Sequence, residues 1–433
     1  MEAEETQNFL PGSGAISPGN SFHKANFDLK SYNSALQWVF IDYSNSWKAG
    51  ISWGMFLALN IGVPLVSHFL YSCENCDLGH QRPFDGIVQI SLSLFAALSF
   101  ICLSHYARKF GLRRFLFLDK LCDESEKVRK GYTHQLQRSL KLLSAFVLPC
   151  VLADGVYKIW WFSTVGSQIP YVYSILITKA IVCTMLICSW LYRVSVCFLV
   201  CLLFRLTCYL QILRLEDFAQ VFERESDVAA ILIEHLRIRR TLRIISHRFR
   251  FFIVSTLILV TASQFASLLV TLEPSTRTDF NTAGDLALCS VTLVMGLFIC
   301  LRSAAKITHK AQAVTSLAAK WHACATIDSF DELDGETPRD QIATPRPECA
   351  IAPDWDNEEE DGDEGDLDNT NLVPIYAHTI TYQKRQALVT YFEHNKAGIT
   401  AYGFILDRTW LHTIFAIQLS LTLWILNKTI GIS

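Results

Sequence analysis

The chain has 433 residues, of which 51% are hydrophobic and only 18% are charged. An average soluble domain carries roughly 25% charged residues, so this deficit indicates a lipid-facing surface and argues against a soluble enzyme. The net charge of -3 includes ten acidic residues and no basic residue within 354–368, so the remainder of the chain is positive.

Residues 1–45 contain no basic start followed by an apolar run, so we expect a cytosolic N-terminal tail rather than a signal peptide. Beyond it, seven apolar runs come close to the roughly 20 residues that cross a bilayer. We predict spans at residues 49–71, 87–103, 142–162, 174–203, 251–272, 286–301 and 409–426. The fourth run has no Gly or Pro as far as residue 222, so its second half should project into water as a continuous helix.

Lys and Arg side chains collect in alternate connections between these spans. Residues 108–141 and 224–250 are rich in them, whereas 72–85, 163–173 and 273–285 are poor. Because basic loops stay in the cytosol, both observations predict a cytosolic N-terminus and an extracellular C-terminus. The predicted fold class is therefore an all-α integral membrane protein with seven transmembrane helices, inverted relative to G-protein-coupled receptors.

Several helices are expected to continue below the membrane. Residues 225–250 place apolar and basic groups at helical spacing, and the Ala-rich stretch 302–324 extends the sixth span. Residues 376–394 are polar and lack Gly and Pro, so we expect another helix there and, together, a cytosolic helical anchor bundle. The predicted parts are the tail 1–45, spans one to six with their extensions 46–326, a disordered acidic loop 327–372, a cytosolic helix 373–396, and the terminal pore-candidate span with the external C-terminus 397–433.

Two ionisable residues lie inside the third span. Asp154 and Lys158 are four residues apart, so they share one helix face and can neutralise each other. Ionisable groups at membrane depth face a bundle interior or a watery cavity by default. Lys179 and Tyr173 could line the same outward cavity. A ligand pocket and a purely structural ion pair both fit these residues.

There is little support in the sequence for an enzyme, a metal centre or a bound cofactor. Cys73 and Cys76 have the spacing of half a zinc site, but a local disulfide or two ordinary thiols fit better because no second pair completes it. Only His68 and His412 fall clearly within spans, and no His-Glu-x-x-His occurs, which argues against a membrane zinc hydrolase. The basic residues fit topology better than nucleic-acid binding.

The last span mixes polar and apolar side chains. His412, Thr413, Gln418 and Ser420 would gain nothing in lipid as parts of a lone helix, so they require a protein interface or water. If four copies met around an axis, Gln418 would form a polar ring and Phe415 an apolar constriction that gates by dewetting. Interhelical packing within one subunit is the alternative.

Together these features resemble the insect odorant and gustatory receptor superfamily and, more closely, the plant gustatory-receptor-like proteins. The insect signature in the final helix is Thr-Tyr, five apolar residues and Gln-Phe. With its Gln aligned on Gln418, residues 411–412 stand at Thr-Tyr, residues 413–417 form the spacer and Leu419 stands at Phe. The Gln and the mostly apolar spacer match, and the flanking pairs differ.

The resemblance implies a homotetramer whose terminal spans form one central pore for cations. It assigns pore and gate positions to Gln418, Phe415, Thr413 and Ile414, and it implies that an extracellular small-molecule ligand opens the pore. A channel of this kind would be expected in the plasma membrane. The rival interpretation is a seven-helix receptor or adaptor that signals through its cytosolic loop.

Overall fold

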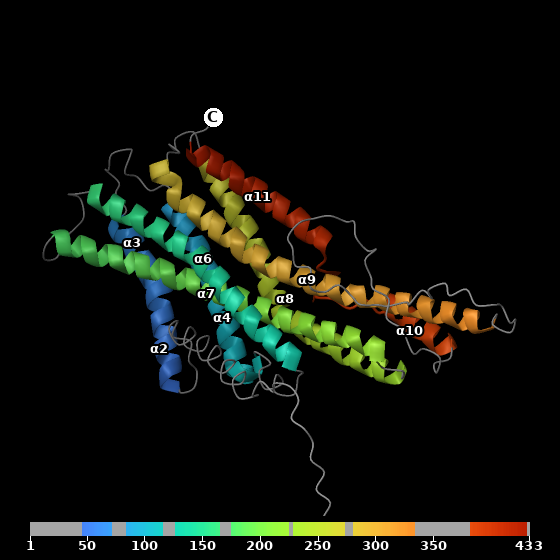
Figure 1. Cartoon of the computed structure of the whole chain (residues 1–433). Coiled ribbons are helices and arrows are strands. Elements are labelled where there is room, and N and C mark those ends of the chain that lie inside the picture. The colour runs from blue at the N-terminus through green and yellow to red at the C-terminus, as the bar shows by residue number, and fades with distance from the viewer. Residues whose placement is uncertain are drawn as a thin grey trace, which may run out of the picture.

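The computed structural model describes residues 46–71, 84–115, 126–164, 175–224, 228–272, 280–333 and 382–430. Within these ranges the chain is helical apart from one short β-hairpin and its flanking turns (Figure 1). The first span comprises α2 (Ser46–Leu57), the π-helical turn η1 (Ala58–Gly62) and α3 (Val63–Tyr71). The elements that follow are α4 (Asp85–Phe115), α6 (Glu126–Thr164), α7 (Ile175–Arg224), α8 (Val228–Thr271), α9 (Phe280–Leu333), α10 (Tyr382–His394), β1 (Thr400–Ala401), β2 (Phe404–Ile405) and α11 (Arg408–Ile430).

The prediction of seven spans agrees with the structure, because within the described ranges seven helical segments are long and apolar enough to cross a membrane. Three of the helices are much longer than a bilayer requires: α7 has 50 residues, α8 has 44 and α9 has 54. At about 1.5 Å per residue they measure roughly 65–80 Å, against a hydrocarbon core of about 30 Å. Each must therefore extend well beyond the membrane, as the uninterrupted fourth run predicted for α7.

The segment between α9 and α10 departs in part from expectation. We predicted disorder from residue 327, but α9 continues as helix to Leu333. The helix expected within 376–394 is present as α10, which the structure describes from Tyr382 to His394. The remainder of the predicted acidic loop and the tail 1–45 lie outside the described residues.

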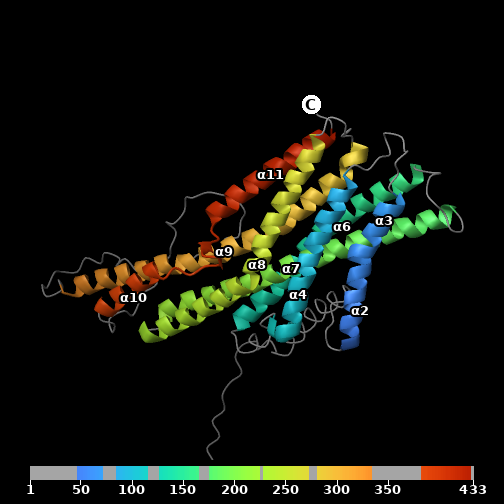
Figure 2. The same cartoon turned by 180° about the vertical axis from the view of Figure 1, so that it is seen from behind.

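The helix α7 is the centre of the molecule. It packs against α4, α6, α8 and α9, and its membrane segment is the most deeply buried of the seven. Helix α11 is much less buried: it packs along one side against α9 and α8, and among the described residues nothing covers its other side. Figures 1 and 2 show α11 at the edge of the molecule from front and back, with α10 beside the far end of α9.

A proline in the first span causes the π-helical turn and two contacts between helices. Pro64 has no amide hydrogen, and the amide of Val63 bonds back to Ala58, so the carbonyls of Leu59 and Asn60 lose their usual partners. The Ser189 hydroxyl of α7 donates a hydrogen bond to the Leu59 carbonyl at 2.6 Å. The Ser93 hydroxyl of α4 donates one to the Asn60 carbonyl at 2.9 Å. The first span is thereby joined to α7 and α4 at membrane depth.

A tight hairpin connects α10 to the last span. Tyr402 and Gly403 form its turn with φ angles of 49° and 93°, a left-handed region that glycine adopts without steric cost. The preceding strand is fixed to two long helices, because the Ile399 amide donates to Thr308 Oγ1 at 3.0 Å and the Thr400 amide donates to the Ser246 hydroxyl at 3.1 Å. The segment that leads into the N-terminus of α11 is therefore held by α8 and α9.

Candidate functional site

The four pore and gate candidates lie on different sides of α11. Gln418 is 3% exposed and faces the bundle, where its side-chain amide donates to Thr261 Oγ1 of α8 at 2.8 Å. Phe415 also faces inward, with its ring centroid 4.6 Å from that of Phe298. Ile414 is half-buried against the core, whereas Thr413 is exposed. Within one chain, Gln418 and Phe415 thus serve as packing residues between α11 and its neighbours.

The uncovered side of α11 carries polar side chains. Thr409, His412, Thr413 and Ser420 are all exposed along the helix. The Thr413 hydroxyl donates a hydrogen bond to the Thr409 carbonyl at 3.0 Å, so its oxygen remains available as an acceptor. The helix begins after Asp407, whose carboxylate accepts the Trp410 amide at 3.0 Å as an N-terminal cap. Polar side chains thus lie among exposed apolar ones, such as Ile417 and Leu423, on a side of α11 that no other described element covers.

The Asp154–Lys158 pair predicted from the sequence forms inside α6. Lys158 Nζ lies 2.7 Å from the Asp154 carboxylate, and the two side chains are 4% and 1% exposed. The ammonium also lies 6.0 Å from the centre of the Trp190 ring on α7, a cation–π arrangement. The pair is therefore buried between α6 and α7 rather than open on the surface.

A buried arginine that the sequence analysis missed lies close to this region. Arg193 on α7 is 1% exposed, and its guanidinium donates to the carbonyls of Ser189 at 3.4 Å and Gln89 at 3.5 Å, and to the Ser93 hydroxyl at 3.3 Å. These acceptors are all neutral, and among the described residues Arg193 makes no ion pair. The signal was present in the sequence as a single Arg inside the apolar run of the fourth span.

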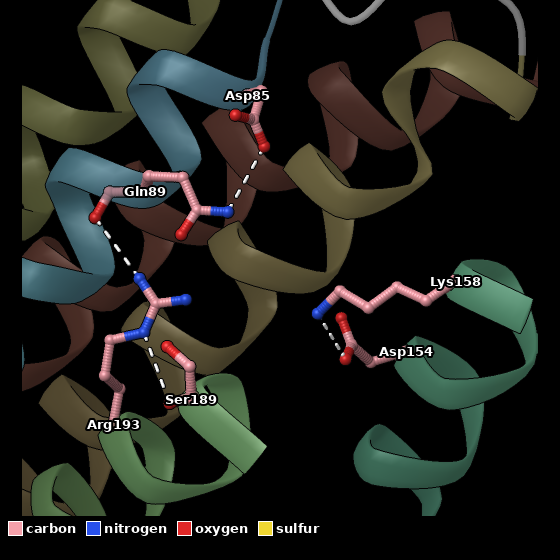
Figure 3. A network of polar contacts seen from close by, with 6 residues as sticks. All are labelled: Asp85, Gln89, Asp154, Lys158, Ser189 and Arg193. Atoms are coloured by element: carbon pink, nitrogen blue, oxygen red, sulfur yellow. Dashed lines mark hydrogen bonds and ion pairs between the residues drawn. The ribbon is translucent and has the colours of Figure 1, made fainter. Parts of the chain in front are cut away.

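A chain of contacts leads from this arginine to the end of α4. The Gln89 side-chain amide donates to the carboxylate of Asp85 at 3.2 Å, while its backbone carbonyl accepts from Arg193. Figure 3 shows Asp85, Gln89 and Arg193 on one side of the view and the Asp154–Lys158 pair on the other, with Lys158 pointing toward the arginine. Four ionisable side chains thus lie in one region of the molecule: Asp85 at the start of α4, Asp154 and Lys158 on α6, and Arg193 on α7.

Two of the predicted pocket residues do not join this cluster. Lys179 is half-buried near the start of α7, and at about 1.5 Å per residue it lies roughly 20 Å along the helix from Arg193. Tyr173, like Cys73 and Cys76, lies outside the described residues. Across the described ranges, no group of three or more His, Cys, Asp or Glu side chains could hold a metal ion.

The family described as "Protein of unknown function (DUF3537)" matches residues 27–417, which is most of the chain. No curated protein matches the sequence, and no solved structure matches the fold.

Proposed function

The chain belongs to the DUF3537 family, and we propose that it is the subunit of a ligand-gated, poorly selective cation channel, a homotetramer with α11 lining a central pore. The observation that carries the proposal is the exposed polar side of α11. Imidazole groups, and hydroxyl oxygens that can still accept hydrogen bonds, are stabilised on a membrane helix by water or by a protein partner. A water-filled pore at the meeting point of several copies supplies both.

The position of α11 supports a pore at a subunit junction. Among the described elements α11 packs mainly on α8 and α9, along one side, which leaves its other side for contact with further copies. The resemblance to plant gustatory-receptor-like proteins and insect receptors implies the same assembly. Under this proposal the N-terminus is cytosolic, the C-terminus is extracellular, and the long ends of α7, α8 and α9 form an anchor bundle with α10 in the cytosol.

The ionisable cluster supports a ligand site in the other half of the molecule. Arg193 and the Asp154–Lys158 pair are retained at membrane depth although burying charge is costly, which is typical of functional positions. We propose that an extracellular small molecule binds at this cluster and favours the open state through its greater affinity for that state. The plasma membrane is the compartment in which such a ligand would be met.

Single-particle imaging of the detergent-purified full-length protein tests the assembly without any ligand. A fourfold ring with α11 beside its axis is the expected result. A monomer, or a dimer with α11 buried laterally, would contradict the channel and favour the receptor or adaptor interpretation. Cation flux into vesicles that contain the purified protein then tests conduction directly.

A further inference from the structure

Six of the exposed residues of α11 follow a regular spacing along one side of the helix. Thr409, Thr413, Ala416, Ser420, Leu423 and Asn427 succeed one another at intervals of four, three, four, three and four residues, and all six are exposed. This is the heptad spacing with which helices face one another across a left-handed bundle. We call these six residues the α11 seam.

We infer that the α11 seam, rather than Gln418, lines the pore, and that Leu423 forms its apolar gate. The inference rests on the proposed channel and reassigns the residues that line it.

The first argument is angular. At about 100° per residue the seam occupies an arc of roughly 80°, and a helix in a fourfold ring presents about 90° to the lumen. Gln418 lies about 180° from the middle of that arc. Its side chain is held there by the bond to Thr261, so rotation of α11 toward the axis would break a 2.8 Å hydrogen bond and expose apolar packing.

The second argument concerns what borders the seam. Trp410 and Ile417 lie beyond one edge and are 50% and 53% exposed. Beyond the other edge lie the exposed His412 and then Leu419, which is 39% exposed. A helix that faced lipid would carry its apolar residues in the middle of its exposed side. Here polar residues predominate in the middle, and apolar residues border it together with His412. A ring of copies favours this order, because the edges meet neighbouring helices while the middle meets water. The occupant of this surface is therefore a further copy of the same chain.

The third argument concerns the chemistry of the lumen. Because the Thr413 hydroxyl donates to the Thr409 carbonyl, its oxygen is left as an acceptor and would favour cations over anions. The seam carries no charged side chain, so it would select weakly among cations. Leu423 is the one large apolar residue in the seam, is 55% exposed, and would close the lumen by dewetting.

Cysteines introduced one at a time into the full-length protein, in vesicles, test which residues line the pore. The variants Thr413→Cys, Ser420→Cys and Gln418→Cys are built on a background in which the exposed native Cys188 is replaced by Ala. The five cysteines whose side chains the structure does not describe are replaced as well: Cys73, Cys76, Cys122, Cys324 and Cys349. They are treated with a quaternary-ammonium methanethiosulfonate, which reacts with thiols in water. We expect modification at positions 413 and 420 and protection at 418. If the cysteine at 418 were modified and the cysteine at 420 were protected, the inference about the seam would be wrong, although the proposed channel could still stand.

The gate is tested by cation flux with a matched pair of leucines. Leu423→Ala should raise ligand-free flux several-fold, whereas Leu421→Ala, a half-buried leucine on the opposite side of the helix, should leave it unchanged. Equal flux in both variants would overturn the gate assignment. If the cysteines at positions 413 and 420 reacted only with a lipid-soluble maleimide, the seam would face lipid, and the assignment of the seam to the pore lining would be wrong. The proposed function is decided separately, since a protein without a fourfold ring on imaging is not this channel.

Discussion

Lys158 Nζ lies 2.7 Å from the Asp154 carboxylate, and both side chains are almost completely removed from water. Removing one partner leaves an uncompensated buried charge, so Asp154→Asn should lower the free energy of unfolding by about 3–5 kcal/mol. The double variant Asp154→Leu with Lys158→Met removes both charges and should lose much less. Thermal unfolding of the purified variants in one detergent compares them, and equal losses in the single and double variants would contradict the prediction.

Arg193 should behave in the opposite way to Asp154. Its contacts to neutral acceptors are 3.3–3.5 Å long, so they offset little of the cost of burying its charge. We expect Arg193→Leu to keep stability within about 1 kcal/mol of the natural protein or to raise it. Arg193→Lys keeps the charge with fewer donors and should unfold at a lower temperature. If Arg193→Leu failed to fold, the contacts of Arg193 would be needed for stability and the prediction would be wrong.

Gly398 lies so close to Thr308 that a side chain at position 398 would collide with it. A Cβ at this position would come within 2.9 Å of the Thr308 methyl carbon, and the hydroxyl of the same threonine accepts the Ile399 amide. Gly398→Ala should therefore cost about 1–3 kcal/mol and loosen the joint between α10 and α11. Adding Thr308→Ser removes the methyl group and keeps the hydroxyl, so it should restore most of the loss.

Another glycine supplies the control for that experiment. At Gly54 in α2, no neighbouring atom lies within 4 Å of the position that a Cβ would take, so Gly54→Ala meets open space. Alanine also favours a helix over glycine by up to about 1 kcal/mol. Limited proteolysis and thermal unfolding should leave this variant as stable as the natural protein or slightly more stable. If Gly54→Ala and Gly398→Ala were equally destabilised, the contact with Thr308 would not be the cause.

The sequence predicted the membrane spans well because long apolar runs carry that signal locally. The continuous helix α7 followed from the absence of Gly and Pro between residues 175 and 224. The π-helical turn could not be predicted in the same way, since Pro64 disturbs the helix only locally and the freed carbonyls find partners on α4 and α7. Arg193 was visible as a lone Arg, but its neutral contacts arise from helix packing.

The orientation of α11 was beyond the sequence for a physical reason. Polar residues occur on two opposite sides of the helix, with Gln418 and Thr422 on one and Thr413 and Ser420 on the other. Composition alone does not show which of the two sides packs against the bundle. The choice is made by tertiary contacts, since Phe298 and Thr261 receive Phe415 and Gln418 and so turn the other side outward.

The hydrogen bond between Gln418 and Thr261 yields the last prediction. Interhelical hydrogen bonds in membranes are worth about 0.6 kcal/mol on average and at most about 1.7. Gln418→Leu, Thr261→Val and the double variant should therefore show a coupling free energy in that range. Because the bond packs α11 inside one subunit, all three variants should keep the same ratio of Na⁺ to K⁺ flux. A changed ratio in Gln418→Leu with an unchanged ratio in Thr261→Val would mean that Gln418 contacts the permeating ions.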